Sequence, residues 1–200
     1  MARIFSVKPA LTFRGRKFKG LRGFSGKPLH PPLTDVPVAC YIIVAIFDLI
    51  SYVAGDDGTI GRDFFISGTH VIVVGAIVSL GAALTGFWDW WKGLEREPTG
   101  PIGRAKHTQA WRTANTHMTI MLTVTLLVII DTIVRIGQWD DGVTSLFVLF
   151  LSLVIAGLVA IGATYGGSLV YDYEFNVEQT YGAVWDERED DIYPGETSPS

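Results

Sequence analysis

Apolar residues gather in four long blocks of this chain rather than recurring at the spacing of an amphipathic helix. A helix needs about 20 residues to cross a hydrocarbon core roughly 30 Å thick, because it rises about 1.5 Å per residue. The second and fourth blocks have almost no polar face, which argues against a soluble helical bundle. The pattern therefore predicts an all-α membrane protein, a four-helix bundle with spans at about residues 36–53, 65–91, 117–136 and 143–169.

Residues typical of helix ends flank these spans. We expect Asp35 to cap the first helix, with Pro37 in its opening turn, where a missing N–H costs little. The tryptophans of residues 88–91 close the second span at the depth of an aromatic belt. Gly137 is expected to end the third helix, and the glycine pair at 166–167 the fourth.

Small residues recur at four-residue spacing in the second and fourth spans, where they would let helices approach closely in lipid. We expect these two stripes to form the centre of the bundle. Their members are Gly75, Ser79 and Ala83 in the second span and Ser152, Ala156, Ala160 and Thr164 in the fourth. Since the spans lack the central break that marks a transporter's substrate site, a small transporter or channel is disfavoured.

The basic residues predict the orientation. Residues 1–35 carry eight Lys or Arg, and the connection at 92–116 carries five, whereas those at 54–64 and 137–142 hold only Arg62 between them. By the positive-inside rule, both termini and the 92–116 connection lie in the cytoplasm. The predicted parts are a basic cytoplasmic tail (1–35), a transmembrane domain (36–169) and an acidic cytoplasmic tail (170–200).

Both tails are expected to act as docking surfaces. The basic tail can bind anionic lipid, each basic residue contributing on the order of 1 kcal/mol, or a partner protein. Residues 172–200 carry nine acids and one base, so anionic lipid repels them and a basic partner attracts them. The expected partners are the lipid bilayer and other membrane subunits, and nucleic acid is not among them.

Asp48, His70 and Asp131 fall near one depth of the spans, roughly 7–9 Å below the outer interface, and Arg135 can reach this layer with its long side chain. Charge inside a span costs about 2.5–3.5 kcal/mol at mid-bilayer, so each needs an explanation. The structural interpretation is an ion cluster that fixes helix register, with His70 hydrogen-bonded nearby. The functional interpretation is a proton-handling or quinol-contacting site, because an Asp–His pair can pass a proton near neutral pH. This outer polar layer consists of Asp48, His70, Asp131 and Arg135.

A second polar layer lies at the predicted cytoplasmic face and consists of His30, Asp35, Asp89, Asn115 and His117. Interfacial capping explains it in structural terms, with Asp89 facing Lys92 or Arg112 and His30 bonded to a helix end. The functional interpretation is a haem b, which needs two axial histidines on facing helices at matching depth. His70 and His117 lie at opposite sides of the membrane, whereas His30 and His117 could share one iron.

The sequence lacks a cysteine cluster, a P-loop, a dinucleotide fingerprint and a nucleophile–histidine arrangement. No catalytic residue, metal site or resident cofactor is therefore predicted. A haem b or a quinone is the alternative, with His30 and His117 as the candidate cofactor-binding residues.

Four motifs occur in order between the apolar spans: HPPLTDVP, GFWDW, WRTANTH and GGSLVY. With these, and with Asp48 and Arg135, the chain resembles over residues 29–180 the bacterial membrane proteins called domain of unknown function 2231. The resemblance implies the bacterial plasma membrane. It also implies a role beside membrane electron transfer, since some relatives are fused to or encoded near a Rieske iron–sulfur domain. Trp111 and Ser168 stand where relatives often have histidine, which weakens the transfer of a haem or metal site from the family.

These observations favour a non-catalytic membrane subunit or accessory of a bacterial respiratory or other electron-transfer complex. The first alternative is a haem- or quinone-binding redox subunit that uses His30 and His117, or Asp48 and His70. The second is a small transporter or channel.

Overall fold

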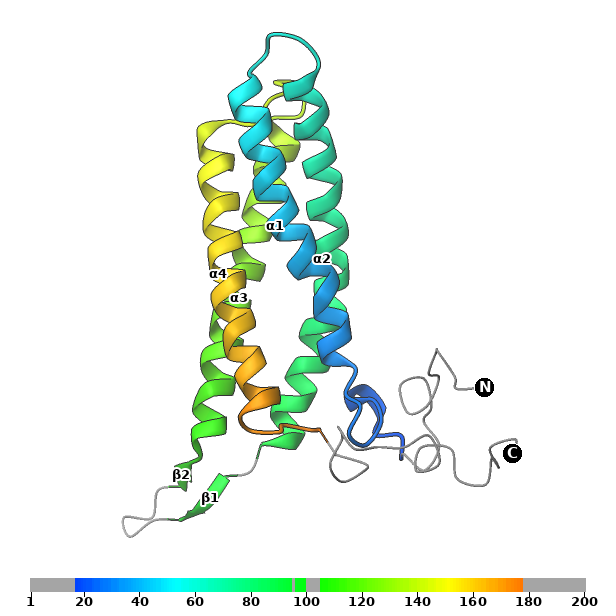
Figure 1. Cartoon of the computed structure of the whole chain (residues 1–200), viewed down its shortest axis with the longest axis vertical. Coiled ribbons are helices and arrows are strands. Elements are labelled where there is room, and N and C mark those ends of the chain that lie inside the picture. The colour runs from blue at the N-terminus through cyan, green and yellow to red at the C-terminus, as the bar shows by residue number, and fades with distance from the viewer. Residues whose placement is uncertain (1–16, 95, 100–104, 178–200) are drawn as a thin grey trace, which may run out of the picture.

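The structure, a computed structural model, describes residues 17–94, 96–99 and 105–177. Four helices run side by side as one elongated bundle (Figure 1). Each is long and apolar enough to cross a membrane, which confirms the predicted four-helix membrane bundle. The helices are α1 (His30–Ala54), α2 (Ile60–Gly93), α3 (Gln109–Gly137) and α4 (Leu146–Tyr171).

The two ends of the bundle differ. At one end, here called the loop end, short connections join α1 to α2 and α3 to α4 (Figure 1). The other end, here called the tail end, carries the 3-10 helix η1 (Gly20–Arg22) and the described residues that follow α4. It also carries the strands β1 (Arg96–Thr99) and β2 (Ala105–His107), which pair antiparallel between α2 and α3. The outer parts of both predicted tails, residues 1–16 and 178–200, lie outside the described residues.

Three of the helices begin earlier than the apolar pattern predicted. The first starts at His30 with prolines in its opening positions, because the fixed φ of proline suits the first helical turn. Asp35 therefore lies within the helix and does not cap it, and Pro37 is an interior residue. The third starts at Gln109, where the Thr108 hydroxyl accepts the Trp111 amide.

The fourth helix starts at Leu146, three residues later than expected, because the Ser145 hydroxyl caps it by accepting the Val148 amide. It passes through the glycine pair at 166–167 and ends at Tyr171. Glycine is tolerated within membrane helices, so the pair does not stop this one. The prediction that Gly137 ends α3 is confirmed.

The bundle is made of two helical hairpins. Contacts are densest between α1 and α2 and between α3 and α4, and α1 packs on α4 to join the two. At Gly75 the two helices of the first hairpin lie close together, since an added Cβ would lie 2.8 Å from Cβ of Cys40. The core along the bundle axis consists of Tyr41, Val44, Ile72, Val124, Val128, Leu151, Ile155 and Val159.

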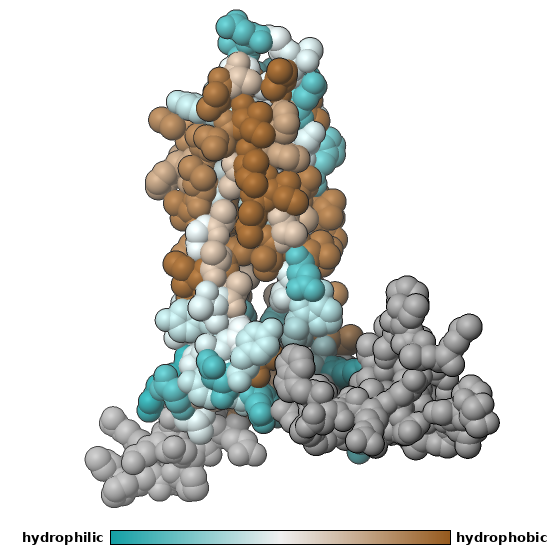
Figure 2. Space-filling view, in the orientation of Figure 1, coloured by the Kyte–Doolittle hydropathy of each residue, from teal (hydrophilic) through white to brown (hydrophobic). Residues whose placement is uncertain are grey.

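The small-residue stripes do not form the whole centre as predicted. Gly75 and Ser152 are buried, but Ala83, Ala160 and Thr164 are exposed. Successive residues turn by about 100° in a helix, so a four-residue step drifts by roughly 40° and carries a long stripe off the interface. Large apolar side chains instead face outward, and Figure 2 shows them covering the middle of the bundle between two polar ends.

Candidate functional site

The structure brings His30 and His117 together inside the tail end of the bundle. His30 is the first residue of α1, and His117 lies two turns into α3. Their ring centroids are 6.2 Å apart, and the ring planes are inclined by 78°. Both residues are half-buried. Two histidines of the predicted cytoplasmic layer thus face one another from different hairpins.

The neighbouring helix of the first hairpin fixes the ring of His30. Its Nδ1 lies 2.8 Å from the Ala82 carbonyl oxygen on α2, and because a carbonyl can only accept, this nitrogen carries the proton. Gly86 stands one turn further along α2. A Cβ added there would lie 2.6 Å from Cε1 of His30, so the missing side chain is what admits the imidazole.

The second hairpin repeats this arrangement. Nδ1 of His117 donates to the Gly162 carbonyl oxygen on α4 at 2.8 Å. Gly166, again one turn further along, leaves room for the ring, since an added Cβ would lie 3.1 Å from Cε1 of His117. In both histidines Nε2 is therefore the nitrogen with an available lone pair. A backbone carbonyl on the other ring nitrogen is the usual support of a metal-binding histidine.

Two imidazoles suffice only for a metal that brings further ligands. In the part of the chain that the structure describes, no group of three His, Cys, Asp or Glu side chains could hold a bare metal ion. Zinc takes three or four protein ligands. Haem iron is held in its porphyrin and asks the protein for axial ligands alone. The donor set therefore fits a haem and does not fit a bare ion.

Polar contacts tie the chain segments together below the histidine pair. Asp89, near the end of α2, accepts from Nε of Arg22 at 3.2 Å and from the Asn176 side-chain amide at 3.2 Å. Arg22 also donates to the Asn176 side-chain oxygen at 3.0 Å. Arg22, the last residue of η1, and Asn176, five residues after the end of α4, thus meet on one carboxylate at the tail end. The basic partner of Asp89 is Arg22, and not Lys92 or Arg112 as predicted.

The other residues of the predicted cytoplasmic layer have different surroundings. Nε1 of Trp90 donates to Oδ1 of Asn115 at 2.7 Å, which joins α2 to α3 beside the histidines. Asp35 is exposed on α1. Of the five residues in this layer, His30 and His117 pair with each other, and Asp89 and Asn115 join neighbouring elements.

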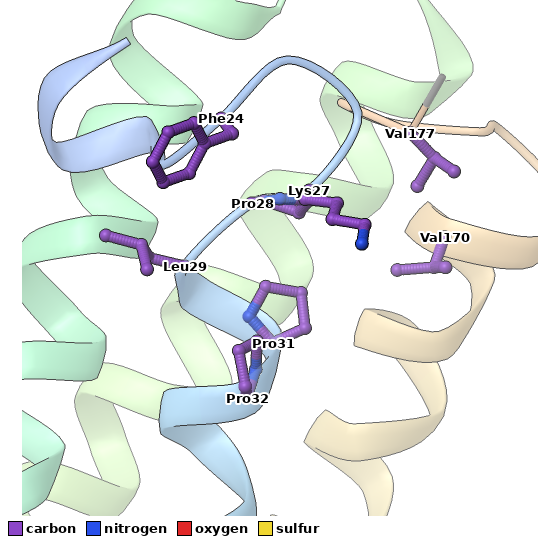
Figure 3. Close-up of a pocket in the computed structure, with 8 residues that line it drawn as sticks. All are labelled: Phe24, Lys27, Pro28, Leu29, Pro31, Pro32, Val170 and Val177. Atoms are coloured by element: carbon purple, nitrogen blue, oxygen red, sulfur yellow. The ribbon is translucent and has the colours of Figure 1, made fainter. Parts of the chain in front are cut away.

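A hollow of about 420 Å³ opens beside the start of α1. Figure 3 shows it between the prolines that follow His30, Val170 near the end of α4, and the ammonium group of Lys27. Its walls are otherwise apolar. The hollow thus lies between the start of α1 and the end of α4, and neither His30 nor His117 lines it.

Three residues of the predicted outer layer form a buried ion cluster near the loop end. Asp48, Asp131 and Arg135 are all fully buried. Nε of Arg135 donates to Asp131 at 3.1 Å, and its Nη2 donates to Asp48. The second oxygen of Asp48 accepts from the Thr144 hydroxyl at 3.1 Å. The guanidinium also lies 6.0 Å from the ring centroid of Phe65 on α2.

His70 is not part of this cluster. It is exposed on the outside of α2, where its Nδ1 donates to the Ile66 carbonyl oxygen of the same helix at 2.8 Å. Its ring lies 6.0 Å from the ring of Trp139. The structure therefore does not assemble an Asp–His pair at the loop end.

The histidine pair and the ion cluster are separated by the same number of residues on α1 and on α3. Asp48 follows His30 by 18 residues, and Arg135 follows His117 by 18 residues. Eighteen residues complete about five helical turns, so in each helix the histidine and the charge point to the same side. Both sides face the axis between the hairpins, where the histidines meet near one end and the charges near the other.

Sequence reasoning missed the supporting residues. Ala82 and Gly162 accept hydrogen bonds from the histidines, and Gly86 and Gly166 leave room for the rings. At the loop end, the Ser51 hydroxyl accepts the Thr144 amide, and the Thr144 hydroxyl donates to Asp48. The glycines recur four residues after the accepting positions, and the 18-residue spacing occurs twice. Both the glycine spacing and the 18-residue spacing can be seen in the sequence when the segment of α1 and α2 is aligned with the segment of α3 and α4.

The fold and these interior polar groups define a class: multi-pass membrane proteins built as a four-helix bundle with ionisable side chains on the bundle axis. Comparison with known proteins then identifies the family. Residues 26–179 match the family described as predicted membrane protein (DUF2231), and the chain belongs to it. No curated protein and no solved structure matches the chain.

Proposed function

We propose that this protein binds a b-type haem that His30 and His117 would hold between its two hairpins, and that it acts as a one-electron carrier in the membrane. The observation that carries the proposal is the pair of imidazoles 6.2 Å apart. Each of them has its Nδ1 proton held by a backbone carbonyl.

The separation of the rings matches this role. With their ring centroids 6.2 Å apart, the two imidazoles are close enough that both could hold one haem iron. Redox cofactors of helical bundles are commonly held by side chains on facing helices.

A haem held in this way supplies a one-electron couple, and the protein's own groups determine how it is held. Ala82 and Gly162 fix the tautomer of the two ligands through their carbonyl oxygens. This function agrees with the predicted place in an electron-transfer complex of the bacterial plasma membrane. On the predicted orientation the histidine pair lies near the cytoplasmic surface.

The test is a reduced-minus-oxidised absorption spectrum of the protein purified in mild detergent from cells supplied with haem. We expect the Soret and α bands of a six-coordinate b-type haem in the native chain. His30→Ala and His117→Ala should each abolish these bands or convert them to those of a five-coordinate haem. His70→Ala is the matched control, because His70 is exposed and bonds within its own helix.

Two results would contradict the proposal. One is a native protein without haem bands after haem supply and after addition of hemin to the purified protein. The other is a haem spectrum that His70→Ala changes while His30→Ala and His117→Ala leave it intact. In the first case the prediction of a non-catalytic accessory subunit would remain.

A further inference from the structure

The ion cluster at the loop end carries more negative than positive charge. It contains two carboxyl groups, Asp48 and Asp131, and one guanidinium, Arg135, all fully buried. With every group ionised the cluster would hold one uncompensated negative charge inside an apolar bundle. Uncompensated charge in such surroundings is costly, whereas a neutral cluster removes most of this cost.

Among the residues that the structure describes, no second cation is paired with the cluster to balance that charge. Besides Arg135, α3 presents Asp131 itself, and α1 presents Asp48. Where α2 faces the cluster it contributes Phe65 and Gly68, neither of which titrates. Thr144 supplies a neutral hydroxyl from the α3–α4 connection. The basic side chain described next to the loop-end connections is Arg62, which is exposed beside Gly142.

The two carboxyl groups differ in how well their oxygens are bonded. Both oxygens of Asp48 accept hydrogen bonds, one from Arg135 and one from Thr144. Asp131 accepts one, from Nε of Arg135, and its Oδ1 is buried without a partner. A carboxylate with a bare buried oxygen is the less stabilised of the two. A proton that neutralises the cluster therefore belongs on Asp131.

Two other buried atoms without a partner lie on the same side of α3. They are Nη1 of Arg135 and Oε1 of Gln138. Residues 131, 135 and 138 share one helix face, and Gln138 follows the end of α3 towards the loop-end surface. A water molecule that bridges such groups would connect Asp131 to the solvent on that side.

We propose that Asp131 is a proton-binding site inside the membrane domain. Its carboxylate takes up one proton from the aqueous phase at the loop end and returns it there, while Asp48 and Arg135 remain an ion pair. The site is about 21 Å from His117 along α3, counted over 14 residues, and it does not depend on a haem.

The test is infrared spectroscopy of the full-length protein in an ester-free detergent at neutral pH. A protonated carboxylic acid has a C=O stretch that carboxylates lack, and exposed acids are ionised at this pH. We expect this band in the native chain, a shift of it in D₂O, and its loss in Asp131→Asn. Asp89→Asn is the matched control, since Asp89 is also buried but lies at the tail end, and it should keep the band.

Isotope labelling makes the result independent of any variant. With ¹³C in the aspartate carboxyl groups, the band of the native chain should move, which excludes glutamate. His30→Ala should keep the band, so failure of the haem proposal leaves this one intact. Absence of the band in the native chain, its persistence in Asp131→Asn, or a band that D₂O does not shift would each overturn the proposal.

Discussion

Replacing Gly86 with alanine should displace His30 from its place against α2 and weaken haem binding. The added Cβ would lie 2.6 Å from Cε1 and 2.8 Å from Nδ1 of His30. Carbon atoms in contact prefer about 3.5–4.0 Å, so the ring must retreat by roughly 1 Å. That movement stretches its hydrogen bond to the Ala82 carbonyl, now 2.8 Å, beyond a useful length.

The Gly86→Ala substitution should lower haem affinity but leave the free energy of unfolding almost unchanged. The lost hydrogen bond costs about 0.5–1.5 kcal/mol, but alanine favours the helix over glycine by about 1 kcal/mol. The free energy of unfolding should therefore change little. Losing the outer support of a metal ligand typically costs about 10–100-fold in metal affinity, so Gly86→Ala should weaken haem binding by that factor.

Two other glycines make a graded comparison. At Gly166 an added Cβ would be 3.1 Å from the His117 ring, so a shift of a few tenths of an ångström suffices and the loss should be smaller. At Gly81, also on α2, an added Cβ meets no atom within 4 Å, so affinity should be unchanged. Hemin titration followed by absorbance measures all three. Equal affinities for the Gly86→Ala and Gly81→Ala variants would refute the reasoning.

Two further predictions concern the ion cluster and the orientation. Arg135→Met leaves two buried carboxyl groups without their cation and should cost about 3–5 kcal/mol, measured as a lower midpoint of denaturant unfolding in detergent. Arg62→Met, an exposed control, should stay within about 0.5 kcal/mol, and equal midpoints would contradict the burial argument. In a Cys40→Ser background, a cysteine at Asp57 should react with an impermeant thiol reagent added outside intact cells, and one at Gly20 should not. The reverse labelling would invert the predicted orientation.

The number of spans could be predicted from the sequence because lipid requires long apolar runs, and those are visible without any tertiary information. The rotation of each helix about its own axis could not be predicted in the same way. Apolar side chains face both the lipid and the core, so hydropathy does not distinguish the two sides. For this reason His70 was expected near Asp48, although it lies on the outside of α2.

The tail-end site was partly predictable for a different reason. The sequence predicts that His30 and His117 lie at one face of the membrane, where they could share one iron, but the apolar pattern starts the first span only at residue 36. The prolines at positions 31 and 32 favour the first turn of a helix that starts earlier, and hydropathy does not reveal this. The role of Gly86 could not be predicted, because a glycine in a membrane helix has several explanations. Only the packing of α1 on α2 shows that Gly86 lies against the His30 ring.

Because the 18-residue interval occurs in both α1 and α3, each of these helices presents its histidine and its charged residue on the same side, about 27 Å apart. The pairing of Arg135 with Asp48 therefore also sets the direction in which both imidazoles point. One residue inserted between His117 and Arg135 would turn one end against the other by about 100°. The bundle could then form the Arg135–Asp48 ion pair or bring His30 and His117 together, but not both.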